Sequence, residues 1–410
     1  KGIKGILRDG PIYTWKRVKR KICQDKKNRD WSKYNEKELA MQRQYPFPRQ
    51  IKFSILVPLY NTPEDFLKEM IASVQAQTYS NWELCLADGS DDEHRQVGQI
   101  VAGFQQQDGR IQYRKLERNL GISGNTNACI EMASGDYIAL FDHDDLLHPS
   151  VLYENMKAIC EQGADFIYTD ELTFQGSTKN ITVAHFKPDF AIDNLRANNY
   201  ICHFTVFQKS LLEKVGLFRS ECDGSQDFDM VLRLTEQAQK IVHIPKPLYF
   251  WRSHAQSVAS SVGAKPYVIQ AAKKAIGDHL KRVGLDGEVL DSVVPSMYRL
   301  KYEIKGEPLI SILIPNKDHV SDLRKCIVSI QEKTSYPNYE IIVIENNSEE
   351  EKTFQYYQLL EKRRNIRVVC WNGKFNYSAI NNFGYTFAKG EYILLLNNDT
   401  EVISADWLQE

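Results

Sequence analysis

The chain lacks any long hydrophobic run. No stretch of its 410 residues approaches the ~18 consecutive apolar residues that a membrane-spanning helix needs. It also lacks Cys-x-x-Cys pairs, because its eight cysteines are scattered along the sequence. We therefore expect no zinc site, and reduced, mostly buried thiols in a cytoplasmic protein. The hydrophobic fraction of 42% is that of a globular protein, and the length predicts two or more domains.

The net charge of −1 conceals a basic N-terminal arm over residues 1–50. Its first 49 residues carry fifteen Lys and Arg against five Asp and Glu, so the rest of the chain is acidic. Apolar residues recur at helical spacing in this arm, with basic residues between them (Ile12, Trp15, Val18 and Ile22). This pattern is typical of a helix on an anionic membrane surface. A helix packed on the rest of the protein, with a solvated basic face, is the alternative. Nucleic acid is not expected as a partner, because no basic groove follows.

Short apolar segments alternate with helical segments in residues 51–260. We expect strands at 53–61, 82–92, 111–117 and 137–141, with helices between them. Such alternation predicts an α/β fold in which a mainly parallel sheet is sandwiched by helices. In these sheets, ligands bind beyond the carboxyl ends of the strands.

Residues 308–410 repeat the same pattern. ISILIPNKD mirrors FSILVPLYN, YEIIVIENNS mirrors WELCLADGS, and GEYILLLNNDTEV mirrors GDYIALFDHDDLL. We therefore expect two tandem copies of one domain, joined by a linker or packing region at 261–307. The second copy is expected to be incomplete, because nothing in it corresponds to residues 165–255.

Each copy ends a buried strand in polar, mostly acidic residues. In the first copy, Asp142 and Asp144 form an Asp-x-Asp with Asp145 beside it. Carboxylates held there are costly unless a cation binds, and hard oxygen ligands suit Mn²⁺ or Mg²⁺ carrying a phosphate group. In the second copy, Asn397 stands in place of the first aspartate and leaves Asp399 as the main charge, so metal affinity should fall.

The order of these motifs resembles the family 2 glycosyltransferases, which have the Rossmann-like GT-A fold. The matching motifs are VPLYN, ADGSDD, FDHDD, GSQDFDMVLRL and WRSH. The resemblance covers residues 51–260 in full and 308–410 as a partial second copy. The tandem arrangement is similar to that of bacterial enzymes that build capsule, O-antigen and cell-wall polysaccharides.

The resemblance implies a donor site, a metal site and a general base. The implied nucleotide-binding residues are Pro58, Tyr60, Asn61, Asp88, Asp91, Arg118, Asn119, Gly121 and Asp142. The implied ligands of Mn²⁺ or Mg²⁺ are Asp142, Asp144 and His254. The implied base is Asp227, with Asp229 as its competitor. Implied sugar or acceptor contacts are Asn199, His203, Asp229 and Trp251.

Several of these residues have simpler interpretations. Asp88 could accept the imide N–H of uracil or thymine, or could cap a helix or complete an Asp-Gly-Ser turn. Asp227 is either a base, which contributes about 10²–10⁴ in rate, or a helix cap. His254 is either a ligand or a structural histidine.

The resemblance implies an inverting, metal-dependent hexosyl- or rhamnosyltransferase. It would move a sugar from a UDP- or dTDP-sugar to a growing, lipid-linked glycan at the inner face of the cytoplasmic membrane. A catalytically inactive sugar-nucleotide-binding or scaffold module is the alternative, and the intact Asp-x-Asp with Asp227 argues against it. A nucleotidyltransferase would need a glycine-rich basic segment, which VPLYNTPED is not.

Overall fold

The computed structural model describes residues 35–254 and 266–410 and divides the chain into two compact units, Lys1–Leu300 and Lys301–Glu410. The amphipathic basic helix expected around residues 12–22 lies outside the described residues. Of the expected arm, the structure describes helix α3 (Glu36–Arg43), which Asn35 caps by accepting from the backbone N–H of Lys37 at 3.2 Å. Across both described ranges, no helix combines the length and apolar character needed to cross a bilayer.

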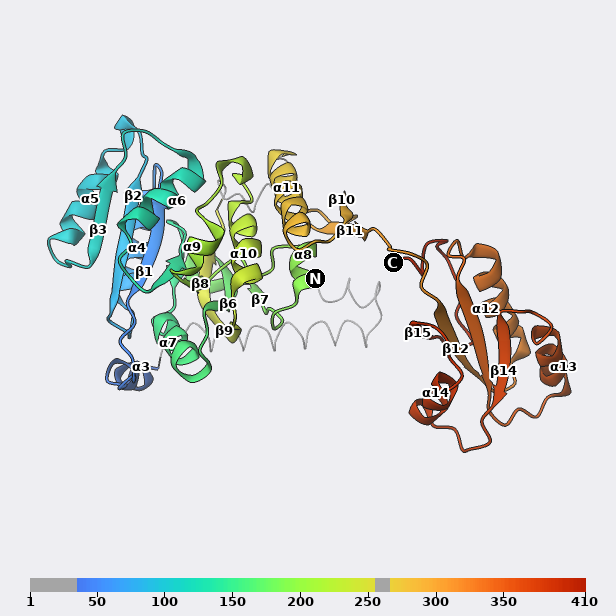
Figure 1. The fold of residues 1–410 in the computed structure, drawn as a ribbon. Coiled ribbons are helices and arrows are strands. Elements are labelled where there is room, and N and C mark those ends of the chain that lie inside the picture. Colours follow the sequence, from blue (N-terminus) through green and yellow to red (C-terminus); the bar gives the residue numbers. More distant parts are fainter. Residues whose placement is uncertain (1–34, 255–265) are drawn as a thin grey trace, which may run out of the picture. The chain divides into compact units, whose positions relative to one another are not determined.

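The first unit is built on a nine-stranded sheet in the order β3-β2-β1-β4-β8-β6-β9-β5, with β7 paired to β6 (Figure 1). The strands are β1 (Phe53–Leu59), β2 (Trp82–Asp88), β3 (Ile111–Lys115), β4 (Tyr137–Leu140), β5 (Leu146–Leu147), β6 (Phe166–Gln175), β7 (Ser177–His185), β8 (Thr205–Gln208) and β9 (Ile241–Arg252). Strands β3, β2, β1 and β4 are parallel, and β9 is parallel to β6, whereas β8 is antiparallel to both β4 and β6. The predicted α/β class with a mainly parallel sheet is confirmed.

Helices connect these strands. They are α4 (Glu64–Gln75), α5 (Gln96–Gln105), α6 (Gly121–Met132), α7 (Val151–Gln162), α8 (Ile192–Ala197), α9 (Leu211–Val215), α10 (Gln226–Gln237) and α11 (Pro266–Arg282), with the single turns η1 (Asp92–His94) and η2 (Ser220–Cys222). A separate hairpin, β10 (Gly287–Asp291) and β11 (Tyr298–Tyr302), follows α11.

Strand β1 lies between two hydrophobic cores. Because side chains alternate along a strand, Ile55 and Val57 pack into one core with Leu67 of α4, while Leu56 packs into the other with Cys129 of α6. A strand buried on both faces reads as a continuous apolar run, as FSILV does. Burial of each such side chain contributes roughly 1.5–3 kcal/mol, so the sheet rigidly fixes the loops that follow its strands.

The second unit repeats this arrangement with a four-stranded sheet in the order β14-β13-β12-β15. Its elements are β12 (Ile310–Asn316), α12 (Val320–Lys333), β13 (Tyr339–Glu345), α13 (Glu351–Leu360), β14 (Ile366–Cys370), α14 (Tyr377–Tyr385) and β15 (Tyr392–Leu395). Strand β12 pairs with β13 and β15 in the registers that β1 makes with β2 and β4: Ile310 opposes Tyr339 and Tyr392, as Phe53 opposes Trp82 and Tyr137. The predicted internal repeat is therefore confirmed.

One glycine recurs at the same point of both units. A Cβ at Gly135 would lie 2.6 Å from the carbonyl oxygen of Lys52, and one at Gly390 would lie 2.6 Å from the backbone nitrogen of Ser311. Backbone atoms cannot move aside as a side chain can. Only glycine therefore lets the chain enter β4 and β15 so close to the neighbouring strand.

Glu83 anchors this entry point in the first unit. Its buried carboxylate accepts hydrogen bonds from Ser54 Oγ and Ser134 N, both at 2.6 Å, and pairs with Lys52 Nζ at 2.5 Å. Burial alone would raise the pKa of Glu83, but the hydrogen bonds from Lys52, Ser54 and Ser134 outweigh it and lower the pKa to about 2.

We expect Glu83→Gln to make the first unit less stable at neutral pH. Because the folded-state pKa lies below the unfolded value of about 4.3, the stabilisation is present above that pH and is lost as pH falls towards about 2. The loss should be on the order of 2 kcal/mol at pH 7 and should vanish near pH 2. Urea unfolding of both proteins between pH 7 and pH 3 measures it.

Glu340 provides the matched control in the second unit. It accepts from Ser311 Oγ and Lys389 N, both at 2.7 Å. Glu340→Gln should leave the unfolding transition of the first unit unchanged. Equal acid sensitivity of wild type and Glu83→Gln would contradict the assignment.

Candidate active site

The loops that follow β1 and β2 are joined by reciprocal hydrogen bonds. Asn61 Nδ2 donates to Asp91 Oδ2 at 2.8 Å, and the backbone N–H of Asp91 donates to Asn61 Oδ1 at 3.1 Å. The backbone N–H of Asn61 also donates to Ser90 Oγ at 2.8 Å. Asn61 lies in the left-handed region with φ 50°, which asparagine tolerates better than most residues. The structure thus brings together the predicted residues Asn61 and Asp91, and Pro58 and Tyr60 precede Asn61 at the end of β1.

Asp88 is turned into the protein. Its side chain is 2% exposed, its Oδ1 accepts the backbone N–H of Ser90 at 2.8 Å, and its Oδ2 accepts Tyr113 Oη at 2.7 Å. Lys115 Nζ lies 3.5 Å from Oδ2. Both carboxylate oxygens of Asp88 already accept hydrogen bonds within the protein. This geometry therefore does not show Asp88 positioned to accept an N–H of a nucleobase. The contacts of Asp88 agree better with a role in the Asp-Gly-Ser turn, which it stabilises by accepting the backbone N–H of Ser90.

The loop after β3 packs against this turn. A Cβ at Gly89 would lie 2.8 Å from Asn125 Nδ2 and 3.1 Å from the Cα of Asn119, so the two loops touch. Asn119 Oδ1 accepts the backbone N–H of Gly121, which has φ 77°, at 3.0 Å. The predicted residues Asn119 and Gly121 therefore shape the entrance to α6, and Arg118 lies exposed beside them.

The acidic loop after β4 has a histidine beside each of its two outer carboxylates. His254 Nε2 lies 2.9 Å from Asp144 Oδ2, and His203 Nε2 lies 3.7 Å from Asp142 Oδ2. The ligand atoms of Asp142, Asp145 and His203 all lie within 4.8 Å of one another, which would suit a metal ion. Partial burial and the neighbouring carboxylate of Asp144 raise the pKa of Asp142. The oxygen and imidazole donors fit a divalent cation such as Mn²⁺.

Asp145 is the deeper member of this group. It is fully buried, and its carboxylate accepts Tyr249 Oη and the backbone N–H of Arg252 at 2.5 and 2.6 Å. Burial, followed by the nearby carboxylates of Asp144 and Asp142, raises its pKa well above the usual range. We therefore regard Asp145 chiefly as the residue that attaches the acidic loop to β9.

The end of β9 clamps the acidic loop in place. The side chain of Arg252 is 4% exposed, its guanidinium carbon lies 4.3 Å from the ring centre of Phe66 and 4.8 Å from that of Phe174, and its Nη2 donates to Glu69 at 2.6 Å. Its Nε also donates to the carbonyl oxygen of Asp144. Cation–π contacts and charge-assisted hydrogen bonds of this kind are strong when they are shielded from water.

Asp227 lies at the start of α10 and faces the same region. Asn199 Nδ2 donates to Asp227 Oδ2 at 2.9 Å, and Cys202 Sγ lies 3.6 Å from the same oxygen. Asp227 is also close enough to Asp142 to contribute to the raised pKa of that residue. Cys202 immediately precedes His203, which lies beside Asp142, so one loop links the predicted base to the predicted metal site. Asn199 contacts the base itself.

His203 and Trp251 contact each other beside the acidic loop. The His203 ring stacks on Tyr249 at 4.8 Å between centroids and meets the edge of Trp251 at 5.4 Å. Both predicted residues therefore lie at the site, with His203 nearer to the metal ligands than expected.

Asp229 does not reach the site. Its side chain has no exposed surface and pairs with Arg219 Nη2 at 2.5 Å and with Arg233 Nη2 at 2.7 Å. Both partners are cations, and the side chain of Arg233 is only 6% exposed, so Asp229 cannot take a proton from an acceptor without unpairing them. The expectation that it competes as base or contacts the acceptor is not supported.

The sequence did not reveal several supporting residues. Tyr113 belongs to a segment read only as a strand, and Arg252 to the WRSH motif, in which only Trp251 and His254 were given roles; nothing in their spacing shows which carboxylate they hold. Asp223 could have been identified as a candidate, because it immediately precedes the GSQDFD motif. Its Oδ1 accepts the backbone N–H of Ser123 at 3.3 Å and ties the start of α10 to α6.

Comparison with known proteins gives a consistent result. The model of the family described as glycosyl transferase family 2 matches residues 54–216 and 311–410. The chain is 43% identical over 363 residues to the uncharacterized protein y4gI of Sinorhizobium fredii, covering 87% of this chain and 40% of that protein. It is 35% identical over 367 residues to the O-antigen biosynthesis protein RfbC of Myxococcus xanthus, covering 88% of this chain and 28% of that protein. The chain thus spans less than half the length of either relative.

Among solved structures, residues 1–349 of TarS from S. aureus in complex with UDP-GlcNAc are similar to this chain. The TM-score is 0.48 at 20% identity, covering 56% of this chain and 66% of that one.

Proposed function

Because this chain belongs to glycosyl transferase family 2, we propose that its first unit transfers a hexosyl or rhamnosyl group from a UDP- or dTDP-sugar to a growing cell-surface glycan, with inversion at the anomeric carbon. The glycan would be a capsule, O-antigen or cell-wall polysaccharide, and the name of the Myxococcus relative supports this class. The acceptor would be lipid-linked, and the basic N-terminal arm would bring the protein to the inner face of the cytoplasmic membrane.

The observation that carries the proposal is the grouping of Asp142 and Asp144 after β4 with His203 and His254 beside them, and the contact of Asp227 with Cys202 on the loop that bears His203. Neighbouring carboxylates such as Asp142 and Asp144 are unfavourable without a cation. Asp142 and Asp144, with His254 or His203, would hold Mn²⁺ or Mg²⁺. When bound there, the ion would neutralise the donor diphosphate and stabilise it as a leaving group.

Asp227 would act as the general base. Asn199 holds one of its oxygens by a hydrogen bond at 2.9 Å and so fixes the orientation of the carboxylate. The carboxylate would accept the proton of the acceptor hydroxyl while that oxygen attacks the anomeric carbon. The diphosphate departs from the opposite face, and this in-line displacement inverts the anomeric centre.

The nucleotide would lie over the turn formed by Asn61, Ser90 and Asp91. Asp88 would contribute by holding Ser90 and Tyr113 in place. Because both oxygens of Asp88 have partners, the test panel should contain GDP-sugars as well as UDP- and dTDP-sugars. Released nucleoside diphosphate, measured with Mn²⁺ and then with excess EDTA, scores each donor. Binding of a donor without any turnover would instead support the scaffold function.

Removing one predicted metal ligand should weaken the dependence of nucleotide binding on the metal ion. Asp144→Ala should weaken the Mn²⁺-linked binding of UDP by about tenfold or more, since it removes a carboxylate that faces the cation. Isothermal titration of UDP with and without Mn²⁺ measures the change.

Asp92→Ala is the matched control for this measurement. Its carboxylate follows β2 at the same sheet edge, is 88% exposed and pairs only with Arg95 among the described residues. This variant should bind UDP as the wild type does. Equal Mn²⁺ dependence in Asp144→Ala and wild type would overturn the metal assignment.

A further inference from the structure

A loop of the first unit, residues 199–203, contacts both the proposed base and the acidic loop. Asn199 Nδ2 donates to Asp227 Oδ2 at 2.9 Å, and Cys202 Sγ lies 3.6 Å from the same oxygen. The imidazole of the last residue of this loop lies 3.7 Å from a carboxylate oxygen of Asp142. A shift of the loop would therefore disturb the base and the acidic loop together.

The backbone of this loop is not held by regular secondary structure, because residues 199–203 belong to no helix or strand. Cys202 has φ 33°, in the left-handed region that a residue with a Cβ seldom adopts. Its carbonyl oxygen accepts Thr205 Oγ1 at 2.9 Å. Backbone in such a conformation persists only where its surroundings fix it. Contacts from the rest of the unit must therefore supply what a helix or strand would.

Lys187 supplies those contacts. Its Nζ donates to the carbonyl oxygen of Ile201 at 2.6 Å and also to that of His203, so one ammonium group binds the carbonyls on either side of Cys202. The third acceptor is Glu171 Oε2, at 3.0 Å. An ammonium group has three N–H donors, and each of them has a partner here. Two of the three partners belong to the loop.

The backbone of Lys187 is itself fixed to β6. Its N–H donates to Asp170 Oδ1 at 2.9 Å, and the carbonyl oxygen of the next residue, Pro188, accepts Tyr168 Oη at 2.7 Å. Asp170 and Tyr168 are buried residues of β6, which pairs with β7, β8 and β9. A continuous set of hydrogen bonds thus runs from the sheet through Lys187 to the loop.

Lys187 is too enclosed to bind a ligand directly. Its side chain is 4% exposed, as is that of Glu171, and its donors already have acceptors. A phosphate or hydroxyl group could reach the ammonium only by displacing a buried carboxylate or a backbone carbonyl, and leaving such a group without its partner is costly. Any effect of Lys187 on the reaction is therefore exerted through the loop.

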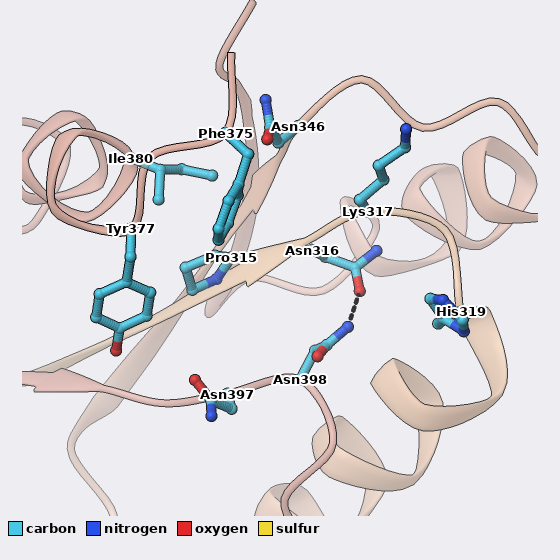
Figure 2. A pocket seen from close by; sticks show the side chains of 10 residues that line it. All are labelled: Pro315, Asn316, Lys317, His319, Asn346, Phe375, Tyr377, Ile380, Asn397 and Asn398. Carbon is cyan, nitrogen blue, oxygen red and sulfur yellow. Dashed lines mark hydrogen bonds between the residues drawn. The ribbon is translucent and has the colours of Figure 1, made fainter. Parts of the chain in front are cut away.

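The second unit holds the corresponding edge of its sheet differently. Figure 2 shows the amide of Asn398, in the loop after β15, donating to Asn316 Oδ1 at the end of β12, at 2.6 Å. The loop after β15 is thus bound to the central part of its own sheet. Among the described residues of the second unit, no strand pairs with β15 as β8 pairs with β4. The contacts of Lys187 therefore have no counterpart in that described part.

We propose that Lys187 is a positioning residue for sugar transfer by the first unit, because its ammonium group fixes the loop over residues 199–203 that orients Asp227 and carries His203. This inference rests on the proposed function, since it takes Asp227 as the base. A misplacement of about 1 Å at a reacting group can cost about a hundredfold in rate. Loss of the contacts of Lys187 should therefore lower kcat although Lys187 touches no substrate.

Lys187→Met tests the proposal, because methionine is nearly as long as lysine but has no hydrogen-bond donor. We expect kcat for nucleoside diphosphate release to fall about tenfold to a hundredfold. KM for the donor should stay within about threefold of the wild type, because the donor turn is held by its own hydrogen bonds between Asn61, Ser90 and Asp91. Amide hydrogen exchange over residues 199–205, measured by mass spectrometry, should become faster by about tenfold or more.

A double variant, Glu171→Leu with Lys187→Met, separates positioning from charge pairing. Lys187→Met alone leaves the buried Glu171 carboxylate without its partner, which lowers stability and could prevent folding. The double variant leaves no charge of this pair buried, so it should unfold at a higher urea concentration than the single variant. The carbonyl oxygens of Ile201 and His203 still lack the ammonium group. Low kcat and fast exchange over residues 199–205 should therefore persist.

Lys209→Met is the matched control. Lys209 also donates from its ammonium group to a backbone carbonyl oxygen, that of Ala133. It follows β8 at the opposite edge of the sheet, where Tyr137 begins β4. Whatever this substitution does to stability, kcat, KM and exchange over residues 199–205 should equal those of the folded wild type.

Three results would overturn the proposal: wild-type kcat and exchange in Lys187→Met, their recovery in the double variant, or a rise in KM with unchanged kcat. Absence of turnover by the wild type with every donor would instead refute the proposed sugar transfer. Hydrogen exchange needs no turnover, so it would still show whether Lys187 fixes the loop. Failure of the proposed function can therefore be distinguished from failure of this inference.

Discussion

Asp227→Asn should lower kcat for sugar transfer by about 10²–10⁴-fold, the usual contribution of a general base. The substitution keeps the size of the side chain and retains an oxygen that can accept from Asn199 Nδ2, now 2.9 Å from the carboxylate. It removes only the ability to take up a proton. Nucleotide binding in Mn²⁺ should stay as in the wild type, because the metal ligands are untouched. Kinetics of nucleoside diphosphate release, with titration of UDP in parallel, separate the two effects.

Glu221→Gln is the control for this experiment. Glu221 lies in the turn that leads into α10, its carboxylate is 51% exposed, and it is 3.8 Å from Arg219. Its substitution should leave kcat unchanged. Wild-type kcat in Asp227→Asn would remove Asp227 from the mechanism.

Asp229→Ala should destabilise the first unit by about 3–5 kcal/mol, the usual cost of leaving a buried charge without its partner. Asp229 has no exposed surface and bonds to two arginines, Arg219 and Arg233. Arg233 cannot turn to solvent easily, because its side chain is 6% exposed and its Nη1 donates to the carbonyl oxygen of Val215 at 2.6 Å. Urea unfolding of the first unit measures the loss.

The neighbouring Asp227→Ala separates stability from catalysis, since it should change the free energy of unfolding by only about 1 kcal/mol. Replacing both Asp229 and Arg233 by leucine and methionine should recover part of the loss, because no charge of that pair is then left buried. A loss of less than about 1 kcal/mol in Asp229→Ala would show that solvent or another group satisfies the arginines.

Helix geometry alone predicts that Asp227 and Asp229 point in different directions. Residues two apart on a helix point about 200° away from each other, while residues four apart share a face. Asp227 and Asp229 therefore could not both face an acceptor. Arg233 lies four residues after Asp229, which is the spacing for an ion pair within a helix. The periodicity was available in the sequence QDFDMVLR, but the side on which the site lies was not.

The strands and their acidic ends were predictable for a different reason. FSILV, WELCLA and YIAL are buried on both faces or nearly so, and their composition fixes them as strands of a covered parallel sheet. Parallel strands end at one edge, which places the loops after β1, β2 and β4 together. The orientation of each polar side chain within those loops was not predictable. Asp88 points inward because Tyr113 of the adjacent strand β3 offers a buried hydroxyl, and no local pattern signals that contact.

His203 was expected near the acceptor and lies beside Asp142. It comes from the loop before β8, and β8 pairs antiparallel with β4. An antiparallel neighbour brings its preceding loop to the same edge at which β4 ends, so His203 meets the acidic loop. Recognising this from sequence would have required the strand order of the sheet, which depends on long-range pairing.

By holding the acidic loop in one conformation, Arg252 lowers the free energy of reorganisation that would otherwise add to the activation barrier. A loop free to move would have to be reshaped each time a cation and diphosphate arrived, and the free energy spent on that reorganisation would be added to the activation barrier. Here the reshaping is completed once, during folding, when the guanidinium becomes enclosed by Phe66, Phe174 and Glu69. The backbone dipoles around Asp144 are then already oriented before substrate arrives, which is the condition for electrostatic preorganisation.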